Sequence, residues 1–239
     1  MTAITSAAIW AVTGILTISL FFVELALTII LFPFDKKRKI NHRQCFWWSS
    51  AVIGFNPYWH LQLSGLENID RHKTYIVVAN HQSLADIVVM YKTRMQFKWV
   101  AKENLFKVPF IGWCLSLTKH IKLSRGNFGS IKKIYREAAY WLRNGMSVVF
   151  FPEGTRSATG KISEFQNGAF KLAIREGKPI LPIAISGTKE AIPKGSWLFK
   201  TKVHGALTVL KPIDTERLKS ADFGFLKDTV HKKLECLVT

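Results

Sequence analysis

The chain is poor in cysteine and in acidic residues. Its three cysteines, Cys45, Cys114 and Cys236, have neither the spacing of a zinc site nor that of a disulfide framework. This usage favours a reducing compartment, and we expect all three thiols to be buried and unreactive. Only 16 acidic residues stand against 34 lysines and arginines, so the net charge of +18 predicts anionic partners. Internal repeats are also absent, which excludes the repeat architectures.

Lysine and arginine are missing from the first 34 residues. That segment is almost unbroken apolar sequence, and at about 1.5 Å per helical residue it reaches across a hydrocarbon layer of ~30 Å. The basic stretch "DKKRK" follows at once and predicts a cytoplasmic flank. Because the apolar run is long and no small-residue cleavage site follows it, we expect a membrane anchor and not a cleaved signal peptide.

Two features complicate this N-terminal segment. Glu24 interrupts the apolar run, and we expect a protonated or snorkelling carboxyl, or a hairpin that dips into one leaflet; a specific polar partner is the alternative. A second stretch, residues 45–61, carries Trp47, Trp48 and Trp59, which either lie along the membrane interface or belong to the core. We therefore assign residues 1–55 to a membrane anchor with an interfacial helix, and residues 56–239 to a globular domain.

The globular part alternates short β-branched or aromatic runs with longer amphipathic ones, which predicts an α/β fold. The expected strands are 74–79, 96–102, 120–125, 147–151, 179–185 and 206–213. The expected helices are 83–94, 109–119, 129–145, 167–177 and 225–238. Ligands of open α/β sheets bind at the carboxyl ends of the strands. Two polar clusters, "NHQSLAD" and "PEGTR", follow such runs, and they share one crevice if their strands are parallel.

The first cluster places His81 five positions before Asp86. One interpretation is structural, with Ser83 capping the helix, Asp86 completing a capping box and His81 a loop residue. The other is chemical: a carboxylate bonded to one ring nitrogen fixes the tautomer and leaves the second nitrogen as a base. The chain has no G-x-S-x-G nucleophile elbow, so such a base is expected to take its proton from a substrate hydroxyl.

The second cluster contains Glu153, Gly154 and Arg156. The glycine permits close approach of the backbone, and the planar guanidinium suits a phosphate group. Glu153 can accept a hydrogen bond from an alcohol or from a neighbouring donor. An exposed ion pair between Glu153 and Arg156 on a turn is the alternative. A basic domain beside a bilayer is drawn to anionic headgroups, which favours a lipid or phosphate partner over nucleic acid.

Four motifs in order carry a family resemblance: "NHQSLAD", "AKENLFKVPFIGW" followed by "LSRGN", "FPEGTRS", and "ILPIAI". Together they resemble the glycerophospholipid acyltransferases, and most nearly the 1-acylglycerol-3-phosphate (lysophosphatidic acid) acyltransferases. The resemblance implies a single acyltransferase domain built on one mixed sheet with helices on its faces. It covers roughly residues 56–210, so the membrane role of the first 55 residues depends on hydropathy alone.

The resemblance also implies roles and partners. His81 is similar to the catalytic base and Asp86 to its orienting partner. Glu153, Gly154 and Arg156, with Lys102 and Arg125 from the second motif, match the substrate-binding positions. Pro182, in the fourth motif, is either near the acyl donor or structural.

No metal or cofactor is implied, and the co-substrate is a thioester of coenzyme A or acyl carrier protein. The expected acceptor is lysophosphatidic acid, in a membrane of phospholipids, with the catalytic domain on the cytoplasmic face, and at the cytoplasmic membrane if the protein is bacterial. Acylation of another lysolipid (such as a lyso-ornithine lipid), thioesterase activity and non-catalytic binding of lipid or nucleic acid are the alternatives.

Overall fold

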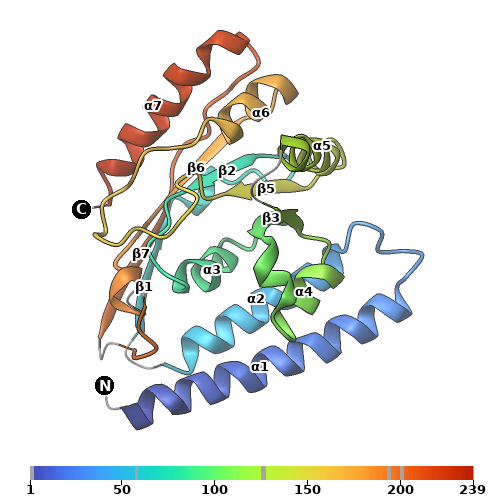
Figure 1. Ribbon diagram of the computed structural model, residues 1–239, viewed down its shortest axis with the longest axis vertical. Helices are drawn as coiled ribbons and strands as arrows, with labels where there is room; N and C mark the ends of the chain where they lie inside the picture. The colour runs from blue at the N-terminus through green and yellow to red at the C-terminus, as the bar shows by residue number, and fades with distance from the viewer. Residues whose placement is uncertain (1–2, 57–58, 125–127, 193–194, 200–201, 239) are drawn as a thin grey trace.

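One mixed seven-stranded sheet forms the centre of the molecule (Figure 1). The computed structural model describes residues 3–56, 59–124, 128–192, 195–199 and 202–238. The strand order is β1-β7-β6-β2-β5-β3-β4. The strands are β1 (Trp59–Ser64), β2 (Ile76–Ala79), β3 (Phe97–Lys102), β4 (Ile121–Leu123), β5 (Ser147–Phe150), β6 (Ile180–Ser186) and β7 (Val203–Val209). Within this order, the neighbouring strands from β6 to β4 are all parallel. Strand β7 is antiparallel to β6, and β1 is parallel to β7.

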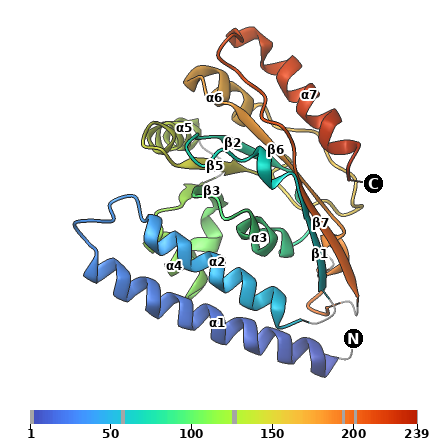
Figure 2. The same ribbon diagram turned by 180° about the vertical axis from the view of Figure 1, so that it is seen from behind.

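Helices cover both faces of this sheet (Figures 1 and 2). They are α1 (Ala3–Ile30), α2 (Lys39–Gly54), α3 (Ala85–Met90), α4 (Ile111–Leu117), α5 (Phe128–Arg143), α6 (Gly168–Glu176) and α7 (Phe223–Glu235). Successive side chains of a strand point to opposite faces. Accordingly, Ile76 and Val78 of β2 join the core under α5, α6 and α7, whereas Val77 and Ala79 join the core under α2 and α3. The α/β prediction, with one mixed sheet and helices on its faces, is confirmed.

Most predicted elements are present, although several bounds differ by a few residues, as in β4, predicted over 120–125, and α7, predicted over 225–238. The strand β1 was not predicted, because its alternating sequence "WHLQLS" follows directly on the aromatic stretch. The last strand, β7, begins at Val203, three residues before the predicted start at residue 206. The helix expected over 83–94 is α only from Ala85 to Met90, and a 3₁₀ turn over Tyr91–Thr93 completes it. The expectation of three buried thiols is wrong for Cys236, which is exposed at the end of α7.

Helix α1 lies along the domain and does not project from it (Figures 1 and 2). Near its start, Ser6 Oγ accepts a hydrogen bond of 3.1 Å from the backbone N–H of Phe199. Farther along, the Phe21 ring contacts Phe110 and Trp113 at centroid distances of 5.6 and 5.3 Å. Within the described residues, α1 is the one helix long and apolar enough to cross a membrane. Its outer side carries exposed large apolar residues such as Phe22, so α1 is a candidate membrane anchor with one side held by protein.

Glu24 faces the protein side of α1, and the expectation of a snorkelling carboxyl is wrong. The residue is fully buried. The Cys45 thiol of α2 donates to Glu24 Oε1 at 3.4 Å, and Asn41 Nδ2 donates to the Glu24 backbone carbonyl at 2.9 Å. A polar partner on the neighbouring helix therefore accommodates the acidic residue, and α1 and α2 form a helical hairpin.

The aromatic stretch after α1 contributes to the core in part. On α2, Trp48 is half-buried against the core, whereas Trp47 has 74% of its surface exposed. Trp59 begins β1. The expected boundary between residues 55 and 56 falls after the end of α2 at Gly54. Because Cys45 belongs to the same core as β2, however, α2 is integral to the folded domain.

Two buried histidines, His42 on α2 and His120 before β4, predict acid sensitivity. Burial, together with the positive charge of Lys98, lowers the pKa of His42 from 6.5 to about 3. Burial also lowers the pKa of His120, whose Nδ1 accepts the backbone N–H of Trp99 at 3.0 Å. The unfolded chain therefore binds more protons than the folded one below pH 6.5, so stability falls as the pH falls.

We expect His42→Phe to weaken this acid sensitivity. The ring of His42 lies among Phe46, Tyr91 and Phe97, and neither of its nitrogens has a hydrogen-bond partner among the described residues. Chemical denaturation at neutral pH and at about pH 5 would measure how much the free energy of unfolding falls between the two. This fall should be smaller in the variant than in the wild type by up to about 2 kcal/mol. His72→Phe, at an exposed histidine, is the matched control. An unchanged loss in His42→Phe would contradict the assignment.

Candidate active site

The expected site residues follow the ends of adjacent parallel strands. The order β2-β5-β3 brings together the loop after β2 with His81, the loop after β5 with Glu153, and the end of β3 with Lys102. Since neighbouring strands lie about 4.8 Å apart, these chain segments meet at one edge of the sheet. The condition that the strands be parallel is met. Strand β4, whose end leads to Arg125, continues the same edge, but Arg125 itself lies outside the described residues.

The carboxylate of Asp86 is directed at the His81 ring. His81 Nδ1 and Asp86 Oδ2 are 2.7 Å apart, with 15% of the histidine side chain exposed and none of the aspartate. A carboxylate at Nδ1 makes that nitrogen the N–H donor, which leaves Nε2 as the acceptor. Within the described residues, Nε2 has no hydrogen bond. The imidazole is therefore held at one nitrogen and unbonded at the other, an arrangement that suits a general base.

Asp86 also organises its own loop. Its Oδ2 accepts the backbone N–H groups of Gln82 at 2.6 Å and Ser83 at 2.9 Å, and its Oδ1 accepts the hydroxyl of Thr188. The Ser83 hydroxyl in turn accepts the N–H of Ala85 at 3.3 Å. Of the two reciprocal bonds of a capping box, only the one from the Ser83 N–H to Asp86 is therefore present, because the Ser83 hydroxyl bonds Ala85 and the Asp86 N–H bonds the Ser83 carbonyl. One carboxylate thus both closes the loop and contacts the ring, so the structural and the chemical interpretations are compatible.

Glu153 connects the loops after β5 and β2. Its Oε1 accepts the backbone N–H of His81 at 2.7 Å, while its Oε2 accepts the N–H and the hydroxyl of Ser163 at 3.0 and 2.8 Å. The residue is buried. Of the two expected uses of this carboxylate, the structure thus displays the bond to a neighbouring donor. Glu153 fixes the backbone position from which the His81 ring extends.

A stack of three rings sets the plane of the imidazole. The His81 ring lies on Phe151 at a centroid distance of 4.1 Å and 14° between planes, and Phe151 lies on Trp99 at 5.4 Å and 20°. These residues belong to β2, β5 and β3 or to the residues directly after them. Their separations are close to the spacing of the strands. The sheet itself therefore holds the ring parallel to its neighbours, while Asp86 fixes its rotation.

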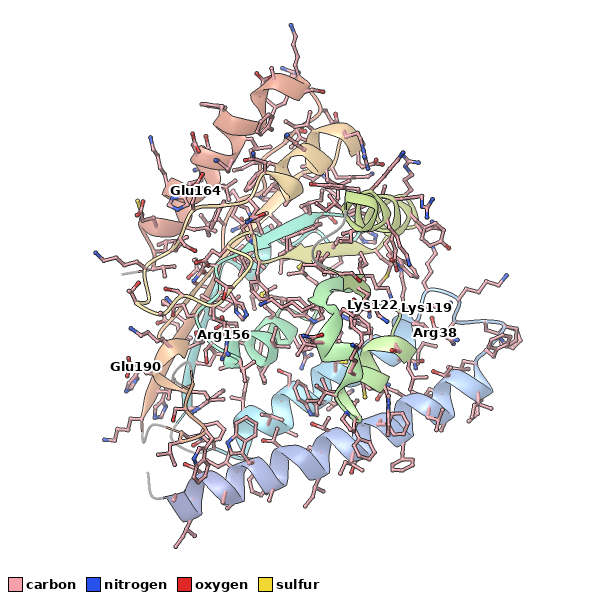
Figure 3. The ribbon with its side chains drawn as sticks, in the orientation of Figure 1. Arg38, Lys119, Lys122, Arg156, Glu164 and Glu190 are labelled. Atoms are coloured by element: carbon pink, nitrogen blue, oxygen red, sulfur yellow. The ribbon has the colours of Figure 1, made fainter. Side chains whose placement is uncertain are left out.

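Arg156 extends from the loop after β5 (Figure 3). The next residue, Ser157, donates its N–H to the His81 carbonyl at 2.8 Å, so the loop that carries the guanidinium is bonded to the loop that carries the base. Gly154 has a φ of +68°, a conformation that glycine adopts without strain, and its N–H closes a turn onto the Phe151 carbonyl at 3.0 Å. Lys102 ends β3 at the same edge and is exposed. Pro182 lies buried within β6, opposite Val78.

Three residues of the site were not found from the sequence. Thr188 lies 102 positions from Asp86, and no local pattern connects them. Asn80 joins the end of β2 to β6, because its side chain bonds both the N–H and the carbonyl of Ile185 at 2.8 and 2.7 Å. Phe151 follows β5 and was read as part of an apolar strand. Asn80 alone had a local signal, since it directly precedes the histidine in "NHQSLAD".

The chain belongs to the acyltransferase family, because the family model described as Acyltransferase matches residues 60–186. This region contains all four motifs and confirms the resemblance. A chloroplastic 1-acyl-sn-glycerol-3-phosphate acyltransferase of Brassica napus is 36% identical over 165 residues, covering 68% of this chain and 47% of that protein. A 1-acyl-sn-glycerol-3-phosphate acyltransferase of Pseudomonas aeruginosa is 32% identical over 169 residues, covering 70% of this chain and 62% of that protein.

A solved structure agrees over nearly the whole chain. The crystal structure of the 1-acyl-sn-glycerophosphate (LPA) acyltransferase PlsC from Thermotoga maritima superposes with a TM-score of 0.71 and 27% identity, covering 96% of this chain and 97% of that one. The chain spans about half the length of the Brassica relative. The fold and the family are therefore established together.

Proposed function

We propose that the chain transfers a fatty acyl group from a thioester, of coenzyme A or acyl carrier protein, to the sn-2 hydroxyl of 1-acyl-sn-glycerol-3-phosphate. The product is phosphatidic acid, a precursor of phospholipids. The names of the curated relatives and of the solved structure support the acceptor. The observation that carries the chemistry is the His81–Asp86 pair, with Nε2 accessible at the edge where the parallel strands end.

The reaction follows from the acid–base character of this pair. His81 Nε2 takes the proton of the acceptor hydroxyl, whose oxygen bonds to the thioester carbonyl carbon. Asp86 stabilises the imidazolium that forms. The tetrahedral intermediate then collapses, the carbon–sulfur bond breaks, and the thiolate leaves with the proton that His81 returns. The enzyme contributes no nucleophile of its own, and alignment of the two substrates supplies much of the remaining acceleration.

Cations around the base would hold the acceptor. Arg156, Lys102 and Arg125 come from three different segments, and in this proposal they bind the phosphate of the lysolipid. The loop bonds between Ser157 and His81 support a fixed relation between the phosphate site and the base. The carrier of the acyl group is acidic in both candidate donors, which suits the net charge of +18.

We expect Arg156→Ala to raise the apparent KM for the phosphate-bearing acceptor by about tenfold or more, because a charge-assisted contact to phosphate is lost. Steady-state kinetics with the thioester donor at saturation would measure the change. Arg143→Ala, at an arginine that pairs with Glu176 on the far side of the sheet, is the control. Unfolding of Arg156→Ala would show instead that the arginine is a structural ion-pair partner.

Purified protein in detergent, supplied with two thioester donors and a panel of acceptors, tests the proposal as a whole. The panel contains 1-acyl-sn-glycerol-3-phosphate, glycerol 3-phosphate, a lyso-ornithine lipid and a neutral lysophospholipid, with products identified by mass. Phosphatidic acid as the main product is the expected result. Release of free fatty acid without an acceptor would indicate a thioesterase.

Membrane attachment is part of the proposal, since one substrate and the product are lipids. The exposed apolar side of α1 supports association with a bilayer. The lysines that follow α1 favour the cytoplasmic face. Because the other side of α1 contacts the domain from Ser6 to Glu24, the helix would lie in the plane of one leaflet.

A further inference from the structure

A cavity lies at the edge of the sheet where the parallel strands begin, opposite the edge that carries His81. Its volume is about 570 Å³, and its walls come from α2, from the loop before β2 and from the turn before β3. Ser147, the first residue of β5, lies in this cavity, whereas Glu153 follows the end of the same strand. Four strand residues separate the two edges by about 13 Å. A ligand in this strand-start cavity would therefore not reach the His81 ring.

The strand-start cavity is strongly basic. Its lining includes five cations, Lys39, Arg43, Arg71, Lys73 and Arg94. The lining contains one acidic residue, Asp70, whose Oδ1 accepts the N–H of His72 at 2.8 Å, so the cations outnumber the carboxylates five to one. Within the described residues, none of the five cations takes part in an ion pair. Positive charges that share one concavity attract an anion, and the guanidinium groups suit phosphate oxygens.

Hydrogen bonds hold the walls of this cavity together. Arg71 Nη1 donates to the Arg94 carbonyl at 3.1 Å, which connects the loop before β2 to the turn before β3. Gln96 Nε2 donates to the Lys39 carbonyl at 3.2 Å, which connects that turn to α2. The cations are therefore carried by segments already bonded to one another, and binding an anion would order little additional backbone.

The lining also has an apolar part, which consists of Phe46 and Trp47 from α2 together with Ile69 and Met95. Trp47 is 74% exposed, although tryptophan is a costly residue to leave in water. A ligand that fits both kinds of wall has a phosphate and an adjoining apolar part. A simple inorganic anion would use only the cations.

The position of the cavity indicates where such a ligand comes from. Helix α2 lies beside α1 in both views of the ribbon, and residues 31–38 connect the two helices (Figures 1 and 2). With the apolar side of α1 in a leaflet, α2 and its exposed tryptophan would lie near the headgroups, where tryptophan is favoured. We propose that the strand-start cavity binds the phosphate of an anionic phospholipid, with Arg43 and Lys73 as phosphate contacts and Trp47 against the adjoining glycerol.

Calorimetric titration of the full chain in neutral detergent tests this site. The ligands are short-chain phosphatidylglycerol, short-chain phosphatidylcholine and inorganic phosphate. All titrations use the Arg156→Ala background, so that the phosphate site of the proposed reaction is weakened. Phosphatidylglycerol should bind more tightly than either of the other two. Since no turnover is measured, the same binding is expected with His81→Ala, whether or not the proposed function is correct.

Charge variants locate the binding. The double variant Arg43→Glu with Lys73→Glu should lower the affinity for phosphatidylglycerol by roughly thirtyfold or more. The milder pair, Arg43→Gln with Lys73→Gln, should lower it by a smaller factor. Lys232→Glu with Lys233→Glu, on exposed residues of α7, makes the same change in net charge and should leave the affinity unaltered. Equal losses in both pairs would overturn the site in favour of general attraction to a basic protein. Binding of inorganic phosphate as tight as that of the lipid would overturn the phospholipid assignment.

Discussion

His81→Ala is expected to lower kcat by about 10²–10⁴-fold while leaving the fold intact, because it removes the group that we propose accepts the hydroxyl proton. The backbone N–H of residue 81 that binds Glu153 is retained in the variant, so the connection between the two loops survives. The loss should appear in kcat and in kcat/KM alike, since the lost interaction belongs to the transition state. Circular dichroism and a thermal midpoint would establish that the protein is folded.

His72→Ala, at an exposed histidine in the loop before β2, provides the comparison for this variant. It should retain full turnover, because residue 72 lies at the opposite edge of the sheet. If His81→Ala retained near-normal turnover, the assignment of His81 as the base would be wrong, and another group would have to take the proton.

The second large effect is expected from Asp86→Ala, which should lower stability by several kcal/mol in addition to abolishing turnover. The side chain is fully buried and accepts bonds from the backbones of Gln82 and Ser83, from the Thr188 hydroxyl and from the His81 ring. Alanine leaves these donors without an acceptor, at about 1–3 kcal/mol for each one that stays buried. Urea unfolding in detergent would measure the loss, with Asp228→Ala at an exposed aspartate of α7 as the control.

Asp86→Asn separates the two roles of the carboxylate. Three N–H groups meet at the Oδ2 position, so the amide oxygen should occupy that position, and the amide NH₂ should face the Thr188 hydroxyl, which can accept a hydrogen bond. The loop and the tautomer would be preserved, while the charge that stabilises the imidazolium is lost. Turnover is then expected between those of the wild type and His81→Ala, with stability near the wild type. Wild-type turnover in Asp86→Asn would contradict an electrostatic role.

Much of the fold could be predicted because the buried parallel strands have strong local signals. The apolar run at residues 74–79 and Gly177 at the end of α6 illustrate this, since each is specified by a few consecutive residues. Strand β1 had no comparable signal. It pairs only with β7, and its alternating pattern was obscured by the aromatic residues before it.

The candidate site, like the fold, has a part that could be predicted from local sequence and a part that could not. His81 and Asp86 are neighbours in the sequence, so their pairing is local, and the capping pattern that made a structural interpretation attractive comes from the same carboxylate. The hydroxyl of Thr188, 102 positions away in the sequence, donates a further hydrogen bond to the same carboxylate. The two residues meet because β2 and β6 are neighbours in the sheet. The partners of Glu153 could not be predicted either, because a carboxylate near a cleft is equally suited to substrate and to backbone donors.

The hairpin of α1 and α2 determines which monolayer of the bilayer would exchange lipids with the protein. A helix that touches the globular domain along one side and lipid along the other has access to a single monolayer. Under the proposed reaction, lysolipid would be collected from that monolayer and the diacyl product returned to it. Growth of the opposing monolayer would then depend on transbilayer movement of lipid by other proteins.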